Sequence, residues 1–116
     1  MEYKFEKFGR TLAVAISGEL DHHNAASLRE VLDNELLSGA AKNLIIDLSC
    51  LELMDSSGIG LIMGRYKLVD SLGGRVCVSG ASLSVKRVIE LSGLSRLVLL
   101  CETPGEAIKN LKGGNR

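Results

Sequence analysis

The chain has few aromatic residues: it contains no tryptophan, and its only aromatic rings besides histidine are those of Tyr3, Phe5, Phe8 and Tyr66. Proteins that bind single-stranded nucleic acids stack bases on aromatic side chains beside a basic groove. Acidic and basic residues number 14 each, so the basic excess that is typical of nucleic-acid-binding domains is also missing. We therefore do not expect nucleic acid as a partner.

Paired cysteines and long apolar runs are missing too. The cysteines are Cys50, Cys77 and Cys101; they are odd in number and form no C-x-x-C pair, which argues against a disulfide framework or a zinc cluster. The first residues alternate charged and apolar side chains, without the apolar core of a signal peptide. No apolar stretch approaches the ~20 residues that a membrane span requires. We expect a cytoplasmic protein with no membrane association and no bound metal.

The formal net charge of zero conceals an uneven distribution of charge. Residues 1–58 contain 10 acids and 5 bases, whereas residues 59–116 contain 4 acids and 9 bases. Halves of opposite sign can steer a partner or attract each other within the fold, and the second is the commoner reason. The sequence leaves open whether the two halves meet inside the fold or at a partner surface.

Apolar residues alternate along the chain between a period of two and a period of 3.6. The pattern predicts strands around 3–7, 12–16, 44–48, 76–78 and 97–100, and helices around 24–37, 59–69, 85–92 and 104–111. The order ββαβαβαβα indicates one α/β domain over residues 1–116, with a mixed, mainly parallel sheet and an N-terminal hairpin. Residues 113–116 are predicted to be a loose tail.

Polar segments follow two of these strands, at residues 18–23 (Gly-Glu-Leu-Asp-His-His) and 54–58 (Met-Asp-Ser-Ser-Gly). Functional groups in open α/β sheets gather at the carboxyl ends of the strands, so we expect the two segments to face each other at one edge. The simplest interpretation of Asp55 is a cap for the following helix, which is worth about 1 kcal/mol.

The helix that follows Asp55 is rich in glycine, with Gly58, Gly60 and Gly64 near its start. Each glycine inside a helix costs about 1 kcal/mol relative to alanine. Gly60 and Gly64 are four residues apart and so share one face of the helix, where they form a strip that another backbone can approach. The sequence leaves open whether that backbone belongs to the protein's own sheet or to a partner.

A serine hydrolase is one alternative function. It would use Ser56 or Ser57 as nucleophile, His22 or His23 as base, and an aspartate to orient the base. The G-x-S-x-G elbow of such enzymes is missing because Asp55 and Ser56 stand directly before Ser57. A P-loop is missing as well, which argues against nucleotide hydrolysis by that route.

Phosphorylation of a serine at the start of this helix explains more of the pattern. A phosphoserine at a helix N-terminus would meet free amides and the positive end of the helix dipole, so the chain need not unfold. The phosphate would add roughly −1.5 to −2 charges beside Asp55 and near Asp21. A partner that covers this helix would have to bury that charge, so we expect phosphorylation to release the partner.

The chain resembles the STAS family of anti-sigma factor antagonists over essentially its whole length. The segments that carry the resemblance are residues 18–23, 54–60, 64–67, 73–74 and 91–94. Asp-Ser-Ser-Gly followed by an apolar residue and glycine is a specific signature of that family. The Asp-His-His and Gly-Arg-Tyr-Lys segments are similar to those of the sporulation members that act on the anti-sigma F factor.

The resemblance implies a partner-switching mechanism. The unphosphorylated protein binds an anti-sigma factor that is also a serine kinase, with ATP or ADP in the kinase's own pocket, and so frees the sigma factor (sigma F). The kinase phosphorylates Ser56, the complex separates, and a PP2C-type phosphatase restores the active form. The protein itself would be no enzyme, would hold no cofactor and would be a monomer when free. The partner-binding residues implied are Asp21, Asp55, Ser57, Gly58, Ile59 and Gly60, with His22 and His23 as loop neighbours.

Overall fold

The computed structural model describes residues 1–113, and it contains five strands and four α-helices within that range. The elements are β1 (Glu2–Phe8), β2 (Thr11–Leu20), α1 (His22–Ser38), β3 (Asn43–Met54), α2 (Ser56–Ser71), β4 (Val76–Ser79), α3 (Leu83–Leu91), a 3-10 turn (Leu94–Arg96), β5 (Leu99–Cys101) and α4 (Pro104–Gly113). This sequence of elements confirms the predicted order ββαβαβαβα. Of the predicted tail, Gly113 ends α4 and the remainder lies outside the described residues.

The strands form one sheet in the order β1-β2-β3-β4-β5. β1 runs antiparallel to β2, and every other neighbouring pair is parallel, so the predicted mixed and mainly parallel sheet is confirmed. The hairpin between β1 and β2 turns at Gly9, whose φ of 62° lies in the left-handed region that glycine adopts without steric cost.

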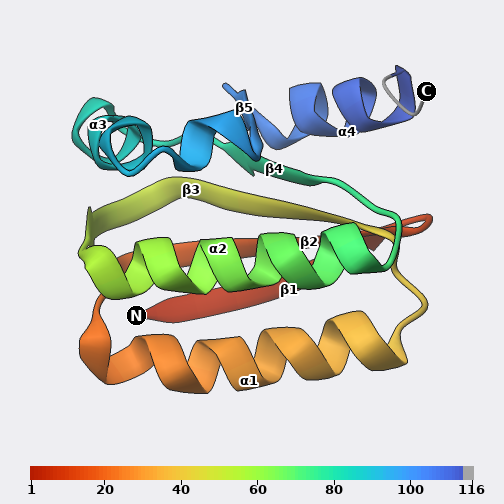
Figure 1. The fold of residues 1–116 in the computed structure, drawn as a ribbon, viewed down its shortest axis with the longest axis horizontal. Helices are drawn as coiled ribbons and strands as arrows, with labels where there is room; N and C mark the ends of the chain where they lie inside the picture. Colours follow the sequence, from red (N-terminus) through yellow and green to blue (C-terminus); the bar gives the residue numbers. More distant parts are fainter. Residues whose placement is uncertain (114–116) are drawn as a thin grey trace.

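Helices cover the two faces of the sheet unequally. α1 and α2 lie side by side on one face, where they and α3 enclose the larger apolar core (Figure 1). The opposite face is covered by α4 through a small cluster that includes Ala107 and Leu111. The fully buried side chains of the larger core include Leu12, Ile16, Leu20, Leu28, Leu32, Leu44, Ile46, Leu48, Ile62 and Ile89. No helix within residues 1–113 combines the length and the apolar character needed to cross a membrane.

Three strand boundaries differ from the prediction by two residues or more, and two of them change the site. β2 continues to Leu20, so Gly18 and Glu19 belong to the strand rather than to a loop. β3 continues to Met54 because Leu51 and Met54 still point into the core, and Asp55 therefore follows the strand directly.

The third difference lies far from that edge. The last strand is Leu99–Cys101 rather than 97–100. Gly93, with a φ of 83°, begins a 3-10 turn over Leu94–Arg96, and this turn delays the strand. The apolar run alone gives no sign of the turn, since its leucines suit either structure.

Candidate functional site

The two polar segments meet at the edge of the sheet where the parallel strands β2 and β3 end. Asp21 is the N-cap of α1 and Asp55 is the N-cap of α2. The backbone amide of Asp55 donates a hydrogen bond of 3.2 Å to the carbonyl of Leu20, which ties the end of β2 to the start of α2. The structure therefore brings Asp21, Asp55 and Ser56 to one edge, as expected.

Asp21 and Asn24 form a reciprocal capping box at the start of α1. The Asp21 carboxylate accepts from the amides of His23 (3.0 Å) and Asn24 (3.3 Å), and the Asn24 side chain accepts from the amide of Asp21 (3.0 Å). Asn24 also donates to the carbonyl of Glu19 at 2.7 Å. α1 consequently begins at His22, two residues before the predicted start; the Asp-x-x-Asn spacing was the available signal.

The amides of Ser57, Gly58 and Ile59 at the start of α2 are already occupied, which corrects in part the expectation that a phosphate on Ser56 would meet free amides: within residues 1–113, only the amide of Ser56 itself in this first turn has no hydrogen-bond partner. The Asp55 carboxylate accepts from the amide of Ser57 at 2.8 Å. The Asp55 carbonyl accepts from the amides of Gly58 (3.0 Å) and Ile59 (3.4 Å). The dipole of the helix still favours negative charge here, but a phosphate would have to displace the Asp55 carboxylate to gain the amide of Ser57.

Ser56 is the first residue of α2, and its side chain is exposed. Within residues 1–113, its hydroxyl forms no hydrogen bond. Asp55 is exposed as well, whereas Ser57 and Ile59 are half-buried, and Ile59 packs against the larger core. The hydroxyl of Ser56 is therefore open to an approaching enzyme without any local unfolding.

The glycines of α2 fall into two structural classes. A Cβ placed on Gly58 would lie 2.2 Å from Cγ of Met54 and 3.2 Å from Cδ2 of Leu20, so Gly58 allows α2 to pack closely on the strand ends. A Cβ on Gly60 or Gly64 would meet no atom within 4 Å. The strip formed by Gly60 and Gly64 thus faces away from the protein's own sheet, so the sheet is not the backbone that approaches it.

The histidines do not form a catalytic arrangement with the serines in the part of the chain that is described. His22 and His23 are exposed, with ring centroids 6.1 Å apart. His22 lines a shallow groove of about 320 Å³ between α1 and α2, together with Ser57 and residues that include Gly60. Among residues 1–113, no hydrogen bond joins an imidazole to Ser56 or Ser57, and no group of three metal-ligating side chains is present.

An ion pair in a second groove connects α1 to α2, and sequence reasoning missed it. Nε of Arg65 lies 2.9 Å from Oδ1 of Asp33, and the Arg65 side chain is only 8% exposed. Burial lowers the pKa of Arg65, while the charge of Asp33 opposes that effect. Arg65 comes from the basic half of the sequence and Asp33 from the acidic half, so the two halves do meet inside the fold.

The comparisons with known proteins show the family of the chain. The model of the STAS domain family matches residues 2–107. The chain belongs to the STAS domain family. It is 32% identical to an anti-sigma F factor antagonist of Paenibacillus polymyxa over 112 residues, which cover 97% of this chain and 96% of that protein.

Solved structures of STAS domain proteins resemble the whole chain. The unphosphorylated form of the anti-sigma factor antagonist SpoIIAA has a TM-score of 0.86 and 32% identity, with 97% of each chain covered. The phosphorylated form of SpoIIAA, described as a Bacillus cell-fate determinant, has a TM-score of 0.76 and 31% identity, with 94% of this chain and 98% of that chain covered. The STAS fold places Asp21, Asp55 and Ser56 of this chain at one sheet edge.

Proposed function

We propose that this STAS domain protein is an anti-sigma factor antagonist that is switched off by phosphorylation of Ser56. Its unphosphorylated form binds an anti-sigma factor that is also a serine kinase, and that binding frees the sigma factor. The observation that carries the proposal is the exposed hydroxyl of Ser56 at the start of α2, beside the outward-facing glycine strip. The relatives named as antagonists, and the solved phosphorylated form of SpoIIAA, support it.

The surface around Ser56 provides the contacts for the partner. Gly60 presents bare backbone to the outside, Ile59 adds a partly exposed apolar side chain, and Asp21 stands at the neighbouring helix start. Ser57 and Gly58 shape the first turn of α2, and Asp55 holds it through the cap. A partner can therefore approach α2 closely at its N-terminal end.

The charge of a phosphate explains how the complex separates. A phosphate on Ser56 adds roughly −1.5 to −2 charges next to the Asp55 carboxylate. Asp55 already accepts the amide of Ser57, so the phosphate stays in solvent or competes for that amide. Burying it under a partner would remove its hydration without supplying a new counter-charge from this chain, so the phosphorylated protein dissociates.

The remaining parts of the mechanism belong to the partners. ATP or ADP is held by the kinase, and this chain needs no cofactor and catalyses no reaction itself. A PP2C-type phosphatase removes the phosphate and restores the binding form. The sigma factor that is released is sigma F, and the cycle takes place in the cytoplasm during sporulation.

The test is an incubation of the purified chain with its cognate anti-sigma factor and ATP, followed by intact-mass and peptide analysis. The chain is expected to gain one phosphate, located on Ser56. The Ser56→Ala variant is expected to gain none while it still binds the kinase, and Ser57→Ala serves as the matched control that is still phosphorylated. A phosphate on Ser56→Ala would overturn the assignment of the site.

The charge argument has a separate test. Ser56→Asp adds a carboxylate where the complex must exclude water, so its affinity for the anti-sigma factor is expected to fall, although one carboxylate imitates a phosphate poorly. Titration calorimetry with Ser56→Ala as the comparison measures the change. An unchanged affinity would contradict the role of charge while leaving the phosphorylation site intact.

A further inference from the structure

Two cysteines meet on the face of the sheet that α4 covers. Cys77 lies in β4 and Cys101 in β5, 24 residues apart in the chain, and both belong to the small apolar cluster beneath α4. Their Sγ atoms are 2.8 Å apart, and one thiol donates a hydrogen bond to the other. A disulfide bond is about 2.05 Å long, so the two sulfurs need to approach each other by about 0.8 Å to form one.

The register of the two strands explains this contact. Cys77 stands opposite Leu99, and Cys101 stands opposite Ser79, so the cysteines are diagonal neighbours across a parallel pair of strands. Residues two apart in a strand point to the same face, and Leu99 and Cys101 therefore both lie on the α4 side with Cys77. The Cα atoms of a disulfide lie no more than about 7 Å apart, so closing a diagonal pair requires a small shift of one strand.

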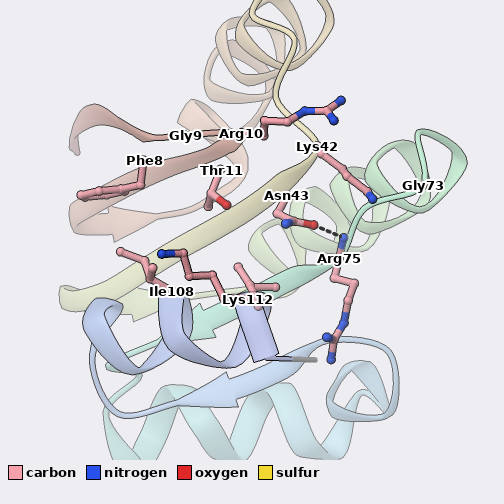
Figure 2. Close-up of a pocket in the computed structure, with 11 residues that line it drawn as sticks. Phe8, Gly9, Arg10, Thr11, Lys42, Asn43, Gly73, Arg75, Ile108 and Lys112 are labelled. Atoms are coloured by element: carbon pink, nitrogen blue, oxygen red, sulfur yellow. Dashed lines mark hydrogen bonds between the residues drawn. The ribbon is translucent and has the colours of Figure 1, made fainter. Parts of the chain in front are cut away.

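β5 is the strand that can make this shift. β4 lies between β3 and β5, and the residue before it is held by Asn43, whose side chain accepts from the amide of Arg75 at 2.9 Å (dashed line in Figure 2). β5 is an edge strand of only three residues, and its residues are half-buried. Short edge elements open and move more readily than the centre of a sheet. The amide of Gly80 donates to the carbonyl of Cys101 at 3.0 Å and keeps Cys101 beside β4.

The surroundings of the two thiols divide the chemistry between them. Cys101 is half-buried, whereas Cys77 is 0% exposed, so a solute from the solvent reaches Cys101 first. Nδ2 of Asn110, on α4, donates to Sγ of Cys101 at 3.4 Å, and the same amide can donate to an oxygen atom carried on that sulfur. Burial, together with the hydrogen bond to Cys101, raises the pKa of Cys77, so Cys77 stays a thiol until its neighbour has reacted.

A buried cysteine is often no more than a small apolar residue of a core. Cys77 packs beside Ile45 and Ala107 in this way. That role requires no second sulfur in contact, and it does not account for Cys101, which is half-buried and bonded to a polar side chain. Cys50 provides the contrast, because it is exposed and, within residues 1–113, no hydrogen bond joins it to another cysteine.

We propose that Cys77 and Cys101 form a reversible disulfide when the protein meets a hydroperoxide such as hydrogen peroxide. The Cys101 thiolate attacks a peroxide oxygen, the O–O bond breaks, and the hydroxide released takes up the thiol proton as water, which leaves a sulfenic acid on Cys101. The Cys77 sulfur then attacks the sulfenic sulfur, the S–S bond forms, and the S–O bond breaks as the oxygen leaves with the Cys77 proton as a second water. Two thiols and one peroxide thus give one disulfide and two waters.

The bond is reversible because a thiol reductant opens it by thiol–disulfide exchange. Disulfides in reducing compartments are usually transient and redox-sensing, which suits a pair that a reductant can reopen. The bond would fasten the edge strand β5 to β4 beneath α4. This modification site does not depend on the function proposed for Ser56, since it lies on the opposite face of the sheet from α2.

The experiment treats the Cys50→Ser chain with hydrogen peroxide in the presence of dimedone, which captures sulfenic acids, and follows it by intact-mass and unreduced peptide analysis. The Cys50→Ser change removes the exposed thiol that could link two chains. The mass is expected to fall by two hydrogen atoms, with Cys77 linked to Cys101, and dithiothreitol is expected to restore it. Peroxide that leaves both thiols free, or that oxidises Cys101 further without linking it to Cys77, would overturn the proposal.

Two comparisons test the order of the steps and the role of the fold. In Cys50→Ser/Cys77→Ala the sulfenic acid has no partner, so dimedone is expected to modify Cys101 about tenfold or more than in Cys50→Ser. In concentrated urea the sulfurs separate, and dimedone adducts are expected to replace most of the disulfide. An equal dimedone yield with and without Cys77, or an equal disulfide yield in urea, would show that the native contact does not direct the reaction. The result for Cys50→Ser alone decides the proposal if the double variant does not fold.

Discussion

We expect replacement of Gly60 by alanine to raise the stability of the protein and to weaken its binding to the proposed partner. Gly60 lies inside α2, where glycine costs about 1 kcal/mol relative to alanine. The added methyl group would meet no atom within 4 Å, so the gain in helix propensity is not offset by a clash. We therefore expect Gly60→Ala to stabilise the fold by about 0.5–1 kcal/mol.

The expected changes are large enough to measure. With a urea slope of about 1–3 kcal/mol/M, the unfolding midpoint would rise by about 0.5 M. The melting temperature would rise by about 2–4 °C for a domain of this size. Gly58→Ala is the matched comparison: its methyl group would overlap Met54, and overpacking of about 1–3 kcal/mol would cancel or exceed the same helical gain.

Binding is expected to change in the opposite direction. If a partner approaches the bare backbone of Gly60, the methyl group holds that partner away, and calorimetry should show weaker affinity for the anti-sigma factor. If Gly60→Ala unfolded at a lower urea concentration than the parent chain, the inference that the added methyl group meets no other atom would be wrong. A more stable variant that binds as well as the parent would refute the role of the glycine strip in recognition.

Three further predictions concern two partly or fully buried groups, the Arg65–Asp33 pair and Cys77. Asp33→Ala removes the carboxylate that faces the guanidinium of Arg65, and we expect it to lower the free energy of unfolding in urea by about 1–3 kcal/mol. This cost is smaller than that of breaking a fully buried pair because the Asp33 side chain is 32% exposed. Glu30→Ala, at an exposed position on the same helix, is the control and should change the free energy little. Burial raises the pKa of Cys77, so iodoacetamide at pH 8 should label the exposed Cys50 and spare Cys77, as peptide mass analysis would show. The pKa of Cys77 is raised from its ordinary value of 9.0 in the folded state, so above about pH 9 the thiol ionises more readily in the unfolded chain. The free energy of unfolding should therefore fall as the pH rises above about 9, and it should fall less in Cys77→Val.

The order of elements was predictable because the apolar periods are clear in the long segments. Val14 and Ile16 alternate in β2, and Leu28 and Leu32 recur at helical spacing in α1. The meeting of Asp21 with Asp55 was also predictable, since parallel strands end at the same edge of a sheet. These inferences needed only the pattern of residue types.

The sequence-based prediction failed where a side chain forms hydrogen bonds with backbone amides or where two helices pack together. The start of α1 depended on the reciprocal bonds of Asp21 and Asn24, and the occupancy of the Ser57 amide depended on the rotamer of Asp55. The pairing of Arg65 with Asp33 depended on how two helices lie against each other. Such contacts are set by tertiary geometry, which periodicity does not contain.

The edge strands have a consequence for solubility. β1 is an exposed edge of seven residues, but Glu2, Lys4 and Glu6 alternate along it, and at the other edge β5 has only three residues. Charged or very short edges discourage pairing with strands of another molecule, which is the route to aggregation. Both edge strands are therefore protected, so the proposed cycles of binding and release at Ser56 need not recruit further copies of the chain through strand pairing.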